Sequence, residues 1–197
     1  MMKWPSVRGL LAGLGFCAGL LGAPAHAEVL LRVEGGLLTG ASGVLVNGAL
    51  YDVSFQDGSC NSLQLNCTQF TFNNADDAGA AAQALLDQVF SGLFDTTPSL
   101  TRGCTLAGAC IVSTIYGPEP LTPVDFNLAT TTNTVAEPGD RAGSGGIIGA
   151  GFDTTPKNDI TIAVWTAAPT SVPEPSALGL ALAGLGGLVM VRRHRRR

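Results

Sequence analysis

The chain has 197 residues, of which 46% are hydrophobic and 13% charged, and its formal net charge is -4 at pH 7. Most basic residues lie at the two ends of the chain. The segment from Glu28 to Val172 contains fourteen acidic and four basic residues, so its formal net charge is minus 10. Phosphate binding needs clustered Lys and Arg, so this acidic middle argues against nucleic acid and anionic membrane surfaces as partners.

Residues 1–27 have the three parts of a secretory signal peptide. Lys3 and Arg8 precede an apolar stretch, and Ala25 and Ala27 occupy the small-residue positions that a signal peptidase requires. The alternative, a buried helix of a cytosolic domain, needs a polar face that this stretch lacks. We therefore expect export, with signal peptidase as the first partner and cleavage after Ala27.

Residues 28–168 are enough for one extracytoplasmic domain, and its first strong signal is a β-hairpin. The stretch GVLVNGALYDVSF alternates apolar and polar residues on both sides of Asn47 and Gly48. Asn-Gly between alternating hydrophobics is the strongest short-range signal for a hairpin turn. We predict two antiparallel strands, with Val44 and Val46 on one face of the first.

Four cysteines remain once Cys17 is removed with the signal peptide: Cys60, Cys67, Cys104 and Cys110. An even number in an exported chain favours disulfides. Two local pairs, Cys60 with Cys67 and Cys104 with Cys110, are the simplest of the possible connectivities. A zinc site is the alternative, but neither pair has the two-residue gap of a zinc knuckle. We therefore expect disulfides, and neither a metal nor another cofactor.

The hydrophobic period changes at residues 75–94, which predict an amphipathic helix. Asn73 or Asn74 can cap its first turn, where Asp76 and Asp77 complement the helix dipole. The apolar side chains recur at four-residue spacing in two rows: Leu85, Val89 and Leu93, and Leu86, Phe90 and Phe94. We expect this stripe to pack on a sheet.

The rest of the domain predicts strands separated by irregular connections. Residues 110–116 (CIVSTIY) and 159–167 (DITIAVWTA) are β-rich, whereas GPEPLTP and EPGDRAGSGG are rich in turn residues. The stretch GSGGIIG at 143–149 has neither the phosphate-loop ending nor the dinucleotide-binding spacing, so we predict a flexible connection. The expected fold class is α+β, a mostly antiparallel sheet with one main helix.

The C-terminal residues predict a linker, a transmembrane segment and a basic cytoplasmic tail. Pro173 and Pro175, within the linker at 169–176, favour an extended backbone. As a helix, the apolar run at 177–191 spans about 22 Å against a hydrocarbon core of about 30 Å, which is short for a permanent anchor. The arginine-rich block at 192–197 would stay in the cytoplasm by the positive-inside bias.

This tail resembles the PEP-CTERM sorting signal of Gram-negative bacteria. Val172, Pro173, Glu174 and Pro175, the short apolar helix and the terminal arginines occur in the order of that family. The resemblance implies an exosortase-type membrane peptidase as partner, a membrane-anchored precursor and a product at the cell surface or outside the cell. It also implies, for the class, an association with extracellular polysaccharide and biofilm matrix. The alternative, an ordinary tail anchor, has no need of the Pro-Glu-Pro kink.

The histidines restrict the acid–base chemistry of the domain. His26 and His194 lie in the predicted signal peptide and tail, so residues 28–168 contain none. This excludes Ser-His-Asp and Cys-His nucleophiles, histidine general bases and histidine metal ligands. Two carboxylates alone can still hydrolyse a glycosidic bond. Seven aspartates are candidates for such a pair: Asp52, Asp57, Asp76, Asp77, Asp125, Asp153 and Asp159.

We therefore expect an exported, tail-sorted surface or extracellular-matrix protein without enzymatic activity. One alternative is a carboxylate-only glycan hydrolase, which needs two acids about 5 to 9.5 Å apart in a cleft. Another is a calcium-dependent polysaccharide-binding module, although no segment carries the ladder of a calcium loop. Neutral sugars would instead stack on Trp165, Tyr51 or Tyr116.

Overall fold

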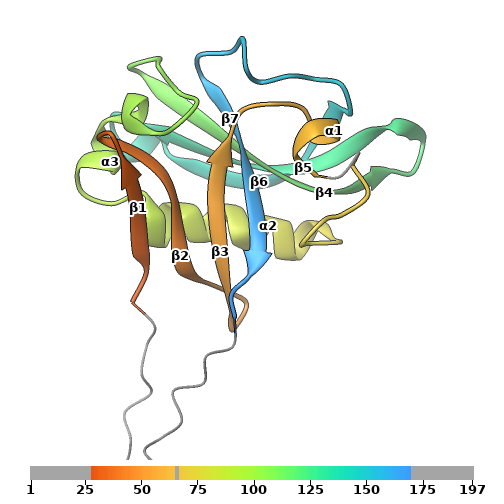
Figure 1. Cartoon of the computed structure of the whole chain (residues 1–197), viewed down its shortest axis with the longest axis horizontal. Coiled ribbons are helices and arrows are strands. Elements are labelled where there is room, and N and C mark those ends of the chain that lie inside the picture. Colours follow the sequence, from red (N-terminus) through yellow and green to blue (C-terminus); the bar gives the residue numbers. More distant parts are fainter. Residues whose placement is uncertain (1–27, 65–66, 170–197) are drawn as a thin grey trace, which may run out of the picture.

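The computed structural model describes residues 28–64 and 67–169, which form a seven-stranded sheet with a helix across one face (Figure 1). The strand order is β1-β2-β3-β7-β4-β5-β6, and all neighbours are antiparallel except β7 and β4. The α+β class with a mostly antiparallel sheet is therefore confirmed. The predicted signal peptide, sorting motif, membrane segment and basic tail lie outside the described residues. Within the described part, no helix combines the length and apolar character needed to cross a membrane.

The first three strands form an antiparallel meander: β1 (Leu30–Glu34), β2 (Leu37–Val46) and β3 (Ala49–Gln56). Asn47 and Gly48 make the turn between β2 and β3 with positive φ angles of 48° and 84°. Two consecutive residues with positive φ define the turn type whose twist matches a hairpin. The predicted hairpin is confirmed.

The other half of the sheet is a second meander of β4 (Ala109–Glu119), β5 (Thr122–Thr134) and β6 (Arg141–Gly149). A short 3-10 helix, η3 (Glu137–Gly139), lies between β5 and β6. The last strand, β7 (Ile160–Ala167), pairs antiparallel with β3 and parallel with β4. β7 thereby joins the two meanders into one sheet.

Two predictions in this half are wrong. The glycine-rich stretch at 143–149, predicted as a flexible connection, belongs to β6 and pairs with β5. The proline-rich stretch predicted as a connection contains Pro118, which lies within β4 at a register shift beside Glu119. Glycine weakens a strand and proline removes a ladder donor, so an edge strand and a bulge are the places where they are tolerated.

The main helix is shorter and less regular than predicted. In α2 (Ala75–Ala84), the side chain of Asn74 accepts a hydrogen bond from the backbone N–H of Asp77 at 2.8 Å, as expected for an N-cap. The chain continues as a π-helix, η1 (Leu85–Val89), and leaves it before Gly92, which has a φ of 59°. The π-helical turn and this left-handed glycine interrupt the predicted helix before residue 94.

A short helix, α3 (Leu93–Thr96), and a 3-10 helix, η2 (Pro98–Leu100), follow this break. Leu93 is 63% exposed, whereas Leu85 and Val89 are completely buried. The row of Leu85, Val89 and Leu93 is therefore buried within η1 and exposed after Gly92, whereas Phe94 of the second row still packs, partly buried, against the core.

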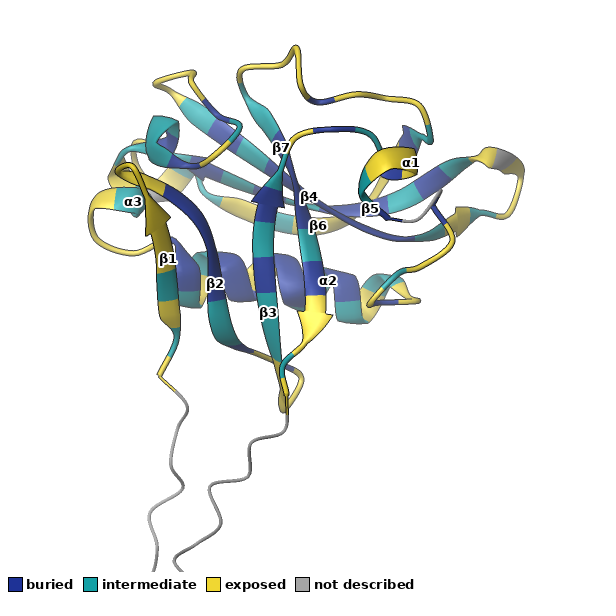
Figure 2. Cartoon of the chain, in the orientation of Figure 1, coloured by how far each residue is buried: buried dark blue, intermediate teal, exposed yellow. Residues whose placement is uncertain are grey.

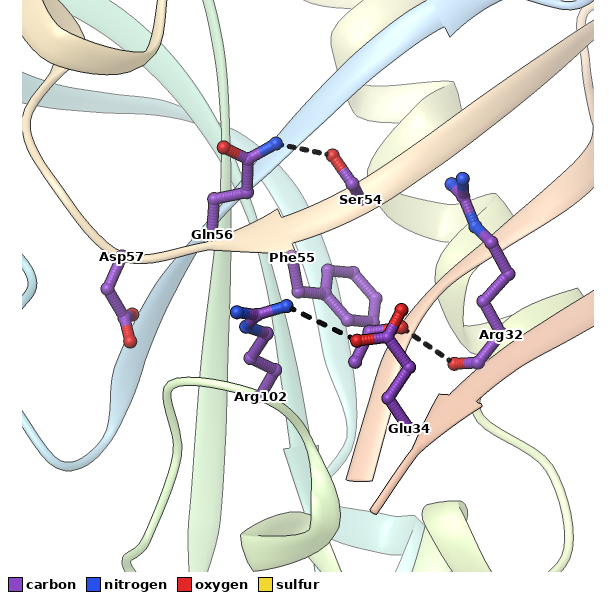
Figure 3. Close-up of a pocket in the computed structure, with 8 residues that line it drawn as sticks. Arg32, Glu34, Ser54, Phe55, Gln56, Asp57 and Arg102 are labelled. Carbon is purple, nitrogen blue, oxygen red and sulfur yellow. Dashed lines mark hydrogen bonds and ion pairs between the residues drawn. The ribbon is translucent and has the colours of Figure 1, made fainter. Parts of the chain in front are cut away.

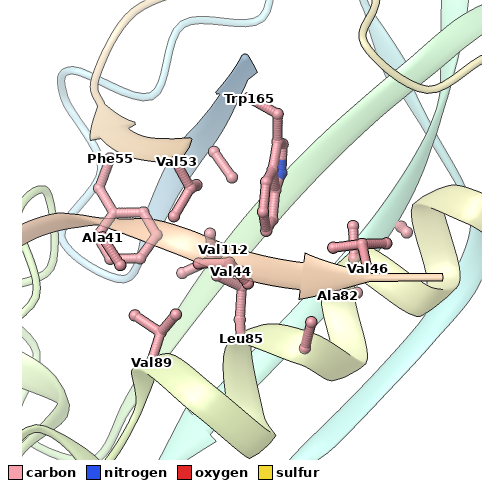
Figure 4. Packing of buried hydrophobic residues seen from close by; sticks show 14 of the residues in the cluster. Ala41, Val44, Val46, Val53, Phe55, Ala82, Leu85, Val89, Val112 and Trp165 are labelled. Atoms are coloured by element: carbon pink, nitrogen blue, oxygen red, sulfur yellow. The ribbon is translucent and has the colours of Figure 1, made fainter. Parts of the chain in front are cut away.

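The main core lies between the sheet and the helical segment formed by α2 and η1 (Figures 2 and 4). Its completely buried side chains include large ones from the strands and from η1 and small ones from α2: Val44, Val53, Phe55, Val112, Leu85, Val89, Ala78, Ala81 and Ala82. Burying one of the large side chains contributes about 1.5 to 3 kcal/mol. Thr131 of β5 donates its hydroxyl to the carbonyl of Ala82 in α2 at 2.7 Å.

The opposite face of the sheet carries a smaller core, covered by loops and by the one-turn helix α1 (Cys60–Leu63). Phe126, Ile148 and Ile162 from the strands pack there with the buried cysteines Cys60 and Cys67.

Both predicted disulfides are formed, and both are local. The Cα atoms of Cys60 and Cys67 are 5.3 Å apart, and those of Cys104 and Cys110 are 5.6 Å apart. The first disulfide fastens α1 over the smaller core. The second ties the turn at residues 101–104 to the start of β4.

The two ends of the described domain lie close in space. β1 begins and β7 ends at the same end of the sheet (Figure 1). β1 and β3 end, and β7 begins, at the opposite end, which we call the distal end.

Candidate functional site

A polar pocket, the distal pocket, lies at the distal end of the sheet (Figure 3). Its volume is about 400 Å³, within the range of small-molecule sites. Eight residues line it: Arg32, Glu34, Thr39, Ser54, Phe55, Gln56, Asp57 and Arg102. Ser54 and Gln56 alternate along β3 with the buried Val53 and Phe55, so their side chains point away from α2.

Arg32 reaches from β1 across the sheet to β3. Its guanidinium donates hydrogen bonds to the carbonyl oxygens of Ala41, at 3.2 Å, and of Val53. Gly40 pairs with Arg32, and a Cβ at this glycine would clash with the Val53 carbonyl. The register between β2 and β3 shifts just beyond Ala41, so Arg32 supplies donors at an irregular part of the ladder. Arg32 thus stabilises the floor of the pocket.

Arg102 has a fixed backbone and a loosely held side chain. Its N–H donates to the carbonyl of Leu38 at 2.9 Å, and the preceding Thr101 forms a parallel bridge with the same leucine. The guanidinium lies 3.9 Å from the carboxylate of Glu34, beyond hydrogen-bond distance, and the two side chains are 54% and 75% exposed. An exposed pair of this kind contributes about 0 to 1 kcal/mol, so Arg102 keeps N–H donors for a ligand.

Asp57 follows β3 and holds several loops together at the pocket rim. Its carboxylate interacts with the hydroxyls of Thr161 and Thr154 and with the charge of Arg102. Gly103 has a φ of 86°, and a Cβ there would clash with the Asp57 carboxylate and with Thr161. The absent side chain of Gly103 therefore leaves the space that the carboxylate occupies.

The surroundings of Asp57 change its acidity. Partial burial of the carboxyl raises the pKa of Asp57 above its ordinary value, although the residue as a whole is exposed. The hydrogen bond from Thr161, the charge of Arg102 and the hydrogen bond from Thr154 oppose this rise, whereas the nearby charge of Asp153 adds to it. Asp57 therefore takes up a proton more readily than an ordinary aspartate.

The distal pocket combines donors and acceptors without a net charge. Figure 3 shows Arg102 between Asp57 and Glu34, and the formal charges of these two acids balance those of the two lining arginines. The amide of Gln56 donates to the hydroxyl of Ser54 at 2.8 Å. This arrangement suits a polar ligand whose groups can both donate and accept hydrogen bonds.

Of the aromatic residues considered for sugar stacking, Trp165 and Tyr116 belong to the buried set, and Tyr51 packs against the core while partly buried. Trp165 and Tyr116 are 5% and 8% exposed. The Trp165 ring packs edge-on against Tyr51 and Phe72, and its N–H donates to the hydroxyl of Thr114 at 3.0 Å.

The structure distributes the predicted aspartates among different roles. Asp52 accepts a hydrogen bond from the Gly43 N–H at 3.1 Å. Asp77 accepts one from the side-chain amide of Asn47 at 2.7 Å. Of the predicted set, Asp57 lines the distal pocket. Among residues 28–64 and 67–169 there is no group of three or more His, Cys, Asp or Glu that could hold a metal ion.

Sequence reasoning missed Arg32, Glu34 and Arg102 as pocket residues. One signal was present, because arginines are rare in this acidic domain. These three side chains come together because of the register of β1 with β2 and the bridge between Thr101 and Leu38. Local sequence patterns specify neither of these contacts.

Disulfides such as the two in this domain are typical of exported proteins. A family model of the PEP-CTERM protein-sorting motif matches residues 171–197, which include the predicted motif Val172, Pro173, Glu174 and Pro175. The chain is a PEP-CTERM domain-containing protein, and this motif implies export, a membrane-anchored stage and processing by exosortase. No curated protein and no solved structure matches the chain.

Proposed function

We propose that this protein is a non-enzymatic component of the cell surface or extracellular matrix, associated with extracellular polysaccharide. The sorting motif at residues 171–197 carries the proposal, because it implies that the domain is exported and processed at its C-terminal end. The geometry supports it, because the distal pocket lies at the end of the sheet opposite the one at which β7, the last described strand, ends.

Export and tail processing are tested by mass spectrometry of the protein recovered from its native host. We expect an N-terminus at Glu28 and loss of the tail near Glu174. Replacing Glu174 by Gln, or Pro173 and Pro175 by Ala, should leave full-length protein in the membrane, since the extended recognition segment is altered. Pro169→Ala, outside the motif, is the matched control. Normal release from the motif variants would contradict exosortase sorting through these residues.

The absence of enzymatic activity is tested with the purified domain and polysaccharide from the host. We expect no hydrolysis from pH 4 to 9, a range of about five units that would reveal an acid with a raised pKa and its ionised partner. The same samples, with and without a chelator, test the calcium-dependent alternative. Binding that disappears with the chelator would support that alternative.

The carboxylate-only glycan hydrolase is the second candidate, and one observation favours it. Asp57, whose pKa is raised by partial burial, and Glu34 both line the distal pocket, and a carboxylate-only glycan hydrolase needs two carboxyls in one cleft. Turnover that is lost in a folded Asp57→Asn variant would replace the non-enzymatic proposal by this one.

A further inference from the structure

We propose that the distal pocket binds a neutral, hydroxyl-rich ligand, a sugar unit of an uncharged polysaccharide, through Arg102, Asp57 and Gln56. This inference rests on the proposed function for the presence of polysaccharide around the protein. The choice of a neutral sugar and the residues that bind it come from the pocket itself.

The lining groups are matched to hydroxyls. Arg102 and Gln56 carry N–H donors, whereas Asp57 and Glu34 carry carboxylate acceptors. A sugar hydroxyl donates one hydrogen bond and accepts others, so neighbouring hydroxyls can meet a donor and an acceptor together. Hydrogen bonds to charged groups are shorter and stronger than those between neutral groups.

Arg102 is suited to this role because its backbone is already ordered. The N–H bond to Leu38, the bridge at Thr101 and the disulfide from Cys104 to Cys110 fix the turn before a ligand arrives. Its guanidinium makes only a 3.9 Å contact with Glu34, so a ligand hydroxyl can approach without breaking a short hydrogen bond. Preordered groups lose little conformational entropy on binding.

The charges disfavour an acidic sugar. A ligand carboxylate near Arg102 would also lie near Glu34 and Asp57, and the domain as a whole is strongly acidic. Like charges at close range cost affinity and slow association. A phosphorylated or uronic polymer therefore meets repulsion that a neutral polymer does not.

The test uses the exported protein recovered after processing, with its disulfides intact, and calorimetric titration. The probes are neutral glucan, galactan and mannan oligosaccharides, each compared with oligogalacturonate of equal length. We expect at least one neutral oligosaccharide to bind, with little dependence on salt, and oligogalacturonate to bind at least tenfold more weakly.

Two substitutions locate the binding site. Arg102→Met should weaken binding of the neutral sugar about 10- to 100-fold, because a charged hydrogen bond is lost. Arg141→Met removes the same charge from the exposed start of β6 and should leave binding unchanged. Gln56→Ala should weaken binding less, which gives a second probe of the pocket if Arg102→Met alters the fold.

Three outcomes would overturn the inference: no binding of any neutral probe, preferential binding of oligogalacturonate, or equal effects of Arg102→Met and Arg141→Met. The proposed function is tested separately by recovery of the processed protein in the matrix fraction. Matrix recovery with unchanged binding in the pocket variants would reject this inference alone.

Discussion

The two faces of the sheet are covered in different ways. One face packs on α2 and η1, and its core side chains Val44, Val53 and Leu85 are completely buried. The other face is covered over its second meander by α1 and by loops, and Phe126 and Ile148 there keep 7% and 8% of their surface exposed.

The main apolar core and the polar side chains of the distal pocket therefore lie on opposite faces of the sheet. The helix-covered face contains the larger apolar core and so supplies most of the hydrophobic stabilisation. On the opposite face, over the first meander, the polar side chains Ser54 and Gln56 line the distal pocket. Of the residues that line the pocket, Phe55 also belongs to the main core, whereas the polar ones do not.

The largest expected effect comes from the helix-covered core. Leu85→Ala removes three side-chain carbons from a completely buried position in η1 and should lower the free energy of unfolding by about 2 to 5 kcal/mol. Leu93→Ala, from the same predicted stripe but at a 63% exposed position, should change it by about 0.5 kcal/mol or less. Urea unfolding followed by circular dichroism measures both. Similar losses in the two variants would mean that the stripe continues beyond the helix break.

The different burial of these two leucines also illustrates which features the sequence could predict and which it could not. The hairpin at Asn47 and Gly48, the N-cap at Asn74 and the local disulfides followed from short-range chemistry. The π-helical turn at residues 85–89 did not, because the apolar spacing is equally compatible with an uninterrupted helix. Strand β6 did not either, because its pairing with β5 supplies the hydrogen bonds that its glycine-rich composition disfavours.

The two disulfides should have similar effects on stability and different effects on the distal pocket. Replacing either pair by alanines should lower the free energy of unfolding by about 2 to 3 kcal/mol, since both close loops of similar length. Loss of the Cys104–Cys110 disulfide should also weaken neutral-sugar binding, because it releases the turn that carries Arg102. Loss of the Cys60–Cys67 disulfide should leave that binding unchanged. Equal binding losses would show that the smaller core also supports the pocket.

The smallest expected effect concerns the pH dependence of stability. The pKa of Asp57 in the folded protein is raised, mainly by partial burial, above the value of about 3.9 in an unfolded chain. Between these two values the folded state binds more protons, so the contribution of Asp57 to stability decreases as the pH rises through that interval. In Asp57→Asn this decrease should be absent, and the variant should gain stability relative to the wild type as the pH rises above about 4.

Asp153 provides a control of opposite sign for this last effect. Hydrogen bonds from the backbone N–H and the hydroxyl of Thr155 lower the pKa of Asp153. Its stabilising contribution is therefore present above the unfolded value of about 3.9 and is lost as the pH falls through the lower folded value. Asp153→Asn should thus lose stability relative to the wild type as the pH rises through this interval, the reverse of Asp57→Asn. Urea midpoints of the three proteins, measured on both sides of the unfolded value of about 3.9, give the difference. The stability of Asp57→Asn should rise relative to the wild type because the Asp57 carboxyl is partly buried, and that of Asp153→Asn should fall because the Asp153 carboxyl is hydrogen-bonded at the surface. Parallel stability curves for the two variants would contradict these two different surroundings.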